Sequence, residues 1–224
     1  MNSPKLPNIS AISETSRGKL SALLDLKTPI GKTSLRELLS STHVFMQGYR
    51  PGGIAALGFG SDEVAEISPG SIYVSLSAYG SDGPWMQRRG FDSLVQSAMG
   101  FNDAEGMAAQ SASPKAFPVQ ILDHATGLLM AFGAQMALLR QQNEGGSWNV
   151  RVSLAQTGHW LRGLGRVPGG LEVQKADFNE YLERSDSGFG VLEAVPHSAQ
   201  FSETPAKWVR PSVPPGTNPA QWPT

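Results

Sequence analysis

Asp123 is the residue whose type and setting most clearly allow chemistry. It follows the mostly apolar run from Val119 to Leu122 and opens a long apolar segment, which we predict to be a buried helix over residues 123–140. One interpretation is structural, because an aspartate at a helix start accepts backbone hydrogen bonds as an N-cap. The other is chemical: a partly desolvated carboxylate at a helix start can attack an acyl group or accept a proton. Neither interpretation excludes the other.

Arginines in glycine- and proline-rich loops are candidate phosphate ligands. Arg50 stands in the segment Tyr49-Arg50-Pro51-Gly52-Gly53, where an arginine fork beside flexible backbone suits a phosphate or an adenine edge. The alternative is a turn with a salt-bridged arginine. Arg88 and Arg89 form either a small phosphate-binding patch or a solvated loop, and taken alone the pair favours the loop.

Several other kinds of site are not indicated. The chain has no cysteine, which excludes disulfides, thiolate catalysis and cysteine-ligated zinc. The four histidines lack metal-ligand spacing, and no metal site is expected. The phosphate-cradling Gly-x-x-x-x-Gly-Lys motif, the dinucleotide Gly-x-Gly-x-x-Gly motif and the Gly-x-Ser-x-Gly elbow are all missing from the sequence.

The elements that must position these residues alternate along the chain. We predict strands at 44–46, 72–76 and 150–154, with helices at about 29–40, from 62, at 92–99, at 123–140 and from about 155. This alternation predicts an α/β fold with an open, mostly parallel sheet and flanking helices. Ligands of such sheets bind at the carboxyl ends of the strands, here the glycine-rich loops 47–53 and 77–83.

The chain divides by composition into three parts. Residues 1–18 read as a polar N-terminal arm, residues 19–165 as one α/β domain, and residues 166–224 as an extended C-terminal segment that returns to the domain. Six prolines between 203 and 224 exclude a regular helix there and predict an extended, proline-rich tail.

Charge and hydropathy exclude some partners. The net charge is −1, so we expect no nucleic-acid or anionic-lipid partner. The longest apolar stretch, 127–139, is interrupted and too short to span a bilayer, and the first residues lack a signal-peptide pattern. We therefore expect a cytoplasmic protein without a membrane segment.

Taken in order, the motifs resemble those of class III CoA-transferases, the family of formyl-CoA transferase, carnitine CoA-transferase and α-methylacyl-CoA racemase. The resemblance covers about residues 17–165. The segments that carry it are Arg17-Gly18-Lys19, Leu24-Asp25-Leu26-Lys27-Thr28-Pro29-Ile30-Gly31, Gly48-Tyr49-Arg50-Pro51-Gly52, Ile72-Tyr73-Val74-Ser75-Leu76-Ser77-Ala78-Tyr79-Gly80, Gly83-Pro84, Gly90-Phe91-Asp92, Gln96-Ser97-Ala98-Met99-Gly100, Leu122-Asp123-His124-Ala125-Thr126-Gly127 and Val150-Arg151-Val152-Ser153-Leu154.

The resemblance implies a Rossmann-like sheet and a transferase that moves CoA between carboxylic acids. The family aspartate that attacks the acyl-CoA thioester, forming an aspartyl anhydride and then a thioester, corresponds to Asp123. The resemblance also implies that Tyr49, Arg50 and Arg89 hold CoA and that Gly80 and Gly83 admit the thioester. It implies coenzyme A as the bound group, without metal or redox cofactor, and acyl-CoA and carboxylic acids as substrates.

Two alternatives remain open. Compared with the family, the N-terminal strand before Arg17 and the small domain after the Ser153 helix are missing, so we expect a short or partial family member. The chain could thus be a non-catalytic, half-site CoA-binding subunit, acting as a homodimer or with a complementary chain. An acyl-CoA racemase is the weaker alternative, because Phe91 stands where racemases carry a histidine and His124 lies outside that position.

Overall fold

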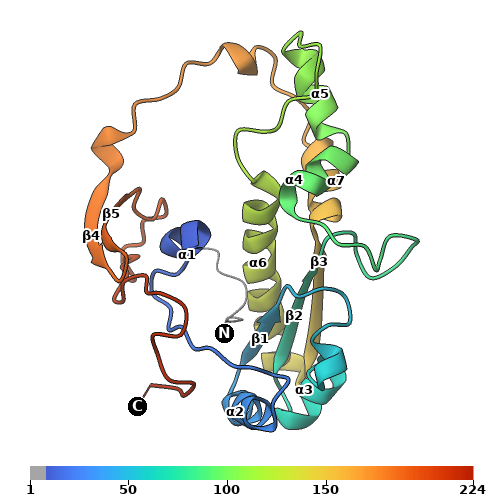
Figure 1. Cartoon of the computed structure of the whole chain (residues 1–224), viewed down its shortest axis with the longest axis vertical. Coiled ribbons are helices and arrows are strands. Elements are labelled where there is room, and N and C mark those ends of the chain that lie inside the picture. Colours follow the sequence, from blue (N-terminus) through green and yellow to red (C-terminus); the bar gives the residue numbers. More distant parts are fainter. Residues whose placement is uncertain (1–8, 224) are drawn as a thin grey trace. The chain divides into compact units, whose positions relative to one another are not determined.

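The computed structural model describes residues 9–223. It divides the chain into two compact units, one of residues 39–173 and one that combines residues up to 38 with residues from 174 onward. The first unit contains a three-stranded sheet and the helices that pack on it (Figure 1). The second contains the N-terminal segment, a two-stranded hairpin and the proline-rich tail.

The sheet is parallel, as the alternation of elements predicted. Its strands are β1 (Val44–Gln47), β2 (Ile72–Ser77) and β3 (Trp148–Ser153), paired in the order β1-β2-β3. The short 3-10 helix η1 (Ala55–Leu57) and helix α3 (Ser61–Ile67) connect β1 to β2.

Three helices lie between β2 and β3, and one follows β3. They are α4 (Asp92–Ala98), α5 (Phe101–Ala108), α6 (Ile121–Glu144) and then α7 (Leu154–Gly163). These crossovers give the mixed α/β class that the sequence predicted.

Helix α6 packs against one face of the sheet. Ala134 and Ala137 of α6 are buried with Ile72 and Val74 of β2, since alternate residues of a strand face the same side. The helix is 24 residues long, longer than the predicted 123–140. We expected the apolar stretch over 127–139 to be too short to span a bilayer, but by length and composition alone the whole helix could cross a membrane. Although α6 packs on the sheet, only Leu122, Thr126, Ala134 and Ala137 of this helix are buried, so the expectation of a buried helix is wrong.

A second apolar cluster joins the helix starts. Ala78, Val95, Phe101, Leu122 and Leu154 are all buried together. They come from the loop after β2 and from α4, α5, α6 and α7, so this cluster fixes where α6 begins relative to its neighbours.

Some elements were not predicted. Helix α5 follows Gly100, whose φ of 74° is in the left-handed region, and its sequence has no clear apolar stripe. Helix α1 (Ile9–Thr15) lies in the segment expected to be an arm, and 3-10 helices η2 (Gly170–Glu172) and η3 (Asn179–Tyr181) were also missed.

The second unit is held by contacts between chain ends. Helix α2 (Pro29–Leu39) begins at the predicted proline. Strands β4 (Glu183–Ser187) and β5 (Gly190–Ala194) form an antiparallel hairpin that is polar and mostly exposed, so it lacks the apolar alternation that predicts a strand. The tail over 195–223 has neither helix nor strand, in agreement with its prolines. The Gly18 amide donates to the Arg210 carbonyl at 2.9 Å, joining the two ends of the chain.

Candidate functional site

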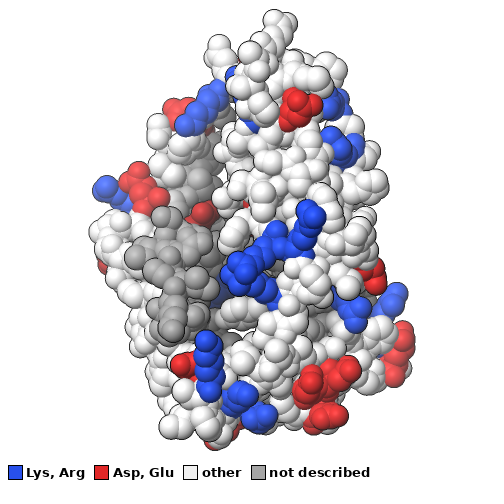
Figure 2. All heavy atoms as spheres, turned by 45° about the vertical axis from the view of Figure 1, so that its right-hand side comes forward, with Lys and Arg blue, Asp and Glu red and all other residues white. Residues whose placement is uncertain are grey.

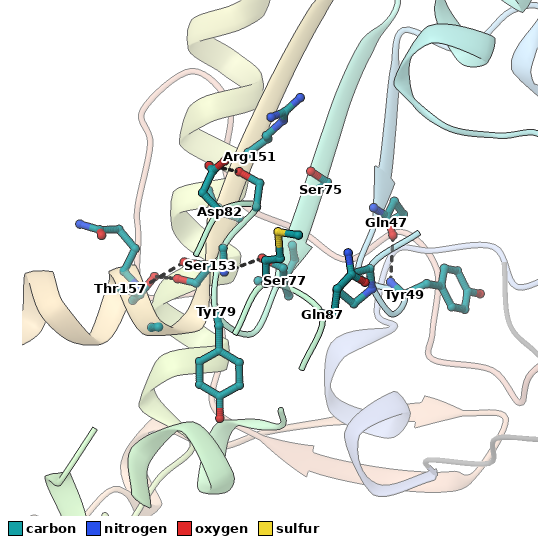
Figure 3. Close-up of a pocket in the computed structure, with 18 of the residues that line it drawn as sticks. Gln47, Tyr49, Ser75, Ser77, Tyr79, Asp82, Gln87, Arg151, Ser153 and Thr157 are labelled. Atoms are coloured by element: carbon teal, nitrogen blue, oxygen red, sulfur yellow. Dashed lines mark hydrogen bonds between the residues drawn. The ribbon is translucent and has the colours of Figure 1, made fainter. Parts of the chain in front are cut away.

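A cavity of about 740 Å³ lies at the carboxyl ends of the three strands (Figure 3). The loops after β1 and β2 form part of its wall, including Tyr49, Gly52 and Gly80. Arg151 of β3 and Trp160 of α7 form another part. The two glycine-rich loops therefore meet at one edge of the sheet, where the α/β fold predicted a ligand site.

A polar row crosses the sheet inside this cavity. Gln47 of β1 pairs with Ser75 of β2, and Ser75 pairs with Arg151 of β3, so the three residues lie at one level (Figure 3). One step further, Ser77 pairs with Ser153, and all five residues line the cavity. The exposed Arg151 guanidinium can bind a phosphate or carboxylate.

Sequence reasoning missed this row. The signal was present in β3, where Arg151 and Ser153 alternate with Val150 and Val152. A period of two in a strand puts polar side chains on the face opposite the apolar one.

The backbone of the two loops is fixed locally. The Tyr49 amide donates to Oε1 of Gln47 at 2.9 Å, and the Gly80 amide donates to Oγ of Ser77 at 3.0 Å. Gly80 and Gly83 have φ values of 96° and 86°, and a Cβ at either would meet nothing within 4 Å. Glycine is thus required there for backbone conformation rather than for space.

The residues expected to bind CoA are only partly brought together. Tyr49 and Gly80 line the cavity, whereas Arg50, Gly83 and Arg89 are not among its lining residues. Arg50 and Arg89 are exposed, and neither forms an ion pair within the part of the chain that the structure describes.

The 81–89 loop is organised around a tryptophan. The Arg88 guanidinium lies 4.5 Å from the centre of the Trp85 ring, and Tyr79 meets the same ring edge-on at 5.0 Å. Arg88 is therefore held by stacking, whereas Arg89 forms no ion pair or ring contact with the residues that the structure describes.

Asp123 lies in the first turn of α6 and outside the cavity wall. The helix begins at Ile121 after the N-cap Gln120, so the interpretation of Asp123 as the N-cap is wrong. The α6 residue that lines the cavity is Leu129, six positions after Asp123, or about 9 Å along the helix axis.

Asp123 is an exposed residue, yet its carboxyl group is electrostatically perturbed. Burial of part of the group raises its pKa above the ordinary 3.8, and the nearby Asp92 carboxylate raises it further. His124 acts in the opposite direction and lowers the pKa. Such a shift is typical of carboxylates at functional sites.

Asp92 is a functional candidate that sequence reasoning missed. Its side chain is 1 % exposed, and its Oδ2 accepts a 2.9 Å hydrogen bond from the Asp123 amide. Its Oδ1 accepts a hydrogen bond from Nε2 of Gln96. Asp92 stands in the segment Gly90-Phe91-Asp92 that carries part of the resemblance, but an aspartate that opens a helix predicts only a local N-cap, so nothing indicated its contact with α6.

Metal chemistry has no assembled ligand set in the described residues. No group of three or more histidine, aspartate or glutamate side chains gathers there at metal-binding distance.

Comparison with known sequences shows a consistent set of relatives. Residues 5–164 match the family model described as CoA-transferase family III. Over 138 residues the chain is 33 % identical to a probable fatty acyl-CoA transferase of Mycobacterium tuberculosis, covering 62 % of this chain and 34 % of the relative. It is 36 % identical over 130 residues to human succinyl-CoA:glutarate CoA-transferase, covering 58 % of this chain and 29 % of the relative.

Solved structures agree on the fold. A CAIB/BAIF family protein from Brucella suis matches with a TM-score of 0.62 at 22 % identity, over 81 % of this chain and 50 % of that one. A crystal form of an M. tuberculosis protein matches with a TM-score of 0.65 at 27 % identity, over 84 % and 52 %. The chain spans only about a third of the length of the two curated relatives named above.

Proposed function

Because the chain belongs to CoA-transferase family III, we propose that it moves CoA between carboxylic acids. The observation that carries the proposal is the family match over residues 5–164, within which Asp123 falls at the start of α6 and a cavity lies at the strand ends. The named relatives are a probable fatty acyl-CoA transferase and a succinyl-CoA:glutarate CoA-transferase, which supports the same reaction class.

CoA would be held at the carboxyl ends of the strands. Tyr49 and Gly80 line the cavity, and Arg151 adds a cation on the sheet face. Arg50 and Arg89 stand exposed on loops that flank it and can bind the phosphates of CoA. Gly83 would keep the second loop open to the thioester.

Asp123 would act as the nucleophile. Its carboxylate oxygen attacks the thioester carbonyl carbon, a C–O bond forms, the C–S bond breaks, and CoA leaves as a thiolate. The thiolate then attacks the Asp123 carbonyl carbon of the anhydride, which releases the first carboxylate and leaves an aspartyl thioester. The second carboxylate attacks this thioester and displaces the thiolate, and the thiolate's attack on the new acyl carbon regenerates Asp123.

A CoA-binding subunit without its own catalysis is the second candidate. The observation that favours it is that Asp123 does not line the cavity, so CoA could bind there without reaching the carboxylate. One relative, 28 % identical over 199 residues, is the beta subunit of a succinyl-CoA–L-malate CoA-transferase of Chloroflexus aurantiacus, which shows that this family includes subunits.

A homodimer or a pairing with a complementary family chain would complete the site in either case. A racemase is the weaker proposal, and the exposed Phe91 at the histidine position still argues against it. The cytoplasmic location and the lack of metal and redox cofactors stay predictions from the sequence.

The test is trapping of the acyl intermediate. The chain is mixed with acetyl-CoA or succinyl-CoA and then with hydroxylamine, which converts an aspartyl anhydride or thioester into a stable hydroxamate. We expect a mass shift that peptide mapping places on Asp123, and we expect the Asp123→Asn variant to lose it while still binding CoA.

The matched control is Asp103→Asn, which removes an exposed aspartate in the first turn of α5. It should leave the mass shift intact. CoA binding by calorimetry with no adduct in the unmodified chain would contradict the transferase and favour the CoA-binding subunit.

A further inference from the structure

The first turn of α6 is capped by another helix. Gln120, the residue before α6, makes no capping hydrogen bond with its side chain. Instead the Asp123 amide, one of the first amides of the helix and without a partner inside it, donates to Oδ2 of Asp92 on α4 at 2.9 Å. A carboxylate at this point also interacts favourably with the positive end of the helix dipole.

Gln96 locks the capping carboxylate in place. Its Nε2 donates to Oδ1 of Asp92 and also to the Val119 carbonyl at 3.3 Å, and its Oε1 accepts from the Phe117 amide at 3.4 Å. Asp92 and Gln96 are 1 % and 3 % exposed. Together they tie α4 to the segment that leads into α6.

Packing alone does not explain this arrangement. A buried carboxyl group costs free energy even when it is hydrogen-bonded, and an apolar side chain of similar size would often stabilise the core as well or better. The group that Asp92 contacts is the backbone of the one residue on α6 that the proposed function uses. The arrangement therefore points to Asp123.

We propose that Asp92 is the positioning residue of Asp123. Its carboxylate, held by Gln96, fixes the Asp123 amide and thereby the direction in which the Asp123 side chain points from the helix. The Cα–Cβ bond of a helical residue tilts toward the helix N-terminus, so fixing the first turn aims the carboxylate beyond the helix end. This inference rests on the proposed function, in which Asp123 attacks the thioester.

Electrostatics supports the same role. Partial burial and the Asp92 charge raise the pKa of Asp123, and His124 on α6 itself lowers it. Asp92 on α4 and His124 are the titratable groups that act on this carboxylate. A more basic carboxylate is the better nucleophile once it is ionised, so Asp92 would both aim and activate it.

The first experiment does not need catalysis. The Asp123 carboxyl carbon is titrated by ¹³C NMR in the full chain, with Asp123→Asn used to assign the signal. In the Asp92→Asn variant the pKa of Asp123 should fall, because a like charge is removed. In the control variant Asp103→Asn it should stay where it is in the unmodified chain. A pKa that does not move in Asp92→Asn overturns the proposal.

The second experiment measures the reaction. Asp92→Asn should slow formation of the trapped adduct by about 10- to 100-fold, the range expected for a misplaced reacting group. Its KM for acyl-CoA should change little, since Asp92 does not line the cavity. Slower adduct formation with a proportional rise in KM, or an unchanged rate, contradicts a positioning role.

Gln96→Ala keeps the inference testable if Asp92→Asn does not fold. This variant leaves the Asp92 charge in place but frees its Oδ1, so the pKa of Asp123 should stay raised while adduct formation slows by about threefold or more. An unchanged rate overturns the proposal. If the unmodified chain forms no adduct, the proposed function fails, and the NMR titration still decides whether Asp92 acts on Asp123.

Discussion

The proposed nucleophile Asp123 shows at the residue scale how an ionised side chain can oppose stability. Its pKa is raised in the folded chain, so folding disfavours the ionised form. The favourable contribution of the protonated carboxyl group to the free energy of unfolding is fully present below the pKa that this group has in the unfolded chain. It is lost as the pH rises through the pKa of the folded chain. The ionised carboxylate is therefore a cost of the folded state at neutral pH, as is common at functional sites.

We predict that Asp123→Asn raises the melting temperature at pH 7, because asparagine removes a charge that folding disfavours. The gain should shrink as the pH falls toward 4, where the native aspartate becomes protonated. Thermal unfolding between pH 4 and 8 checks this, with Asp103→Asn as the control. A gain that grows on acidification would contradict the direction of the shift.

At the element scale, the packing of α6 on β3 depends on glycine at one position. A Cβ on Gly133 would lie 2.7 Å from Cγ1 of Val150, whereas a Cβ on Gly127 of the same helix would meet nothing within 4 Å. Val150 is β-branched and cannot easily turn away. Gly133 therefore sets how closely the helix approaches the strand.

These two glycines give a matched prediction. Gly127→Ala should stabilise the chain by about 0.5–1 kcal/mol, because alanine is the better helix former. Gly133→Ala gains the same propensity but suffers overpacking of about 1–3 kcal/mol, so it should be destabilising. Urea unfolding followed by circular dichroism measures both changes in stability. Stabilisation by Gly133→Ala would contradict the close contact between Gly133 of α6 and Val150 of β3.

At the scale of the whole molecule, charge nearly cancels while apolar surface is concentrated. The net charge is −1, although Figure 2 shows a group of Lys and Arg in the middle of the face and a group of Asp and Glu at its lower right. In contrast, α6 exposes an apolar stripe of Leu128, Phe132 and Leu139, which are 75 %, 61 % and 53 % exposed. A contiguous exposed apolar stripe is typical of an interaction surface.

We predict that the chain self-associates through this stripe. Phe132→Lys should shift it toward the monomer, because burying the new charge would be costly. Gln142→Lys, at an exposed polar position of the same helix, should leave the association unchanged. Sedimentation equilibrium distinguishes the two, and an unmodified chain that stays monomeric at high concentration would contradict the prediction.

Local patterns in the sequence were sufficient for much of the fold. The apolar, β-branched and aromatic run at 72–76 and the valines near 150 predicted strands, and the long, mostly apolar segment after Leu122 predicted the long helix, because the length and residue types of an apolar run distinguish strands from helices. Order along the chain also predicted the parallel sheet, and the order of motifs indicated the family. Helix α5 and the β4–β5 hairpin escaped prediction because nothing in their own residues has a strong period.

The sequence by itself therefore determined the class of fold, the family and the candidate nucleophile. Only the tertiary structure decided which residues meet. The row from Gln47 to Arg151 depends on the register of three strands, and the contact of Asp92 with the Asp123 amide joins residues 31 positions apart. Such pairings arise from how helices and strands pack in space, and short-range patterns carry no information on distances between segments that are remote along the chain.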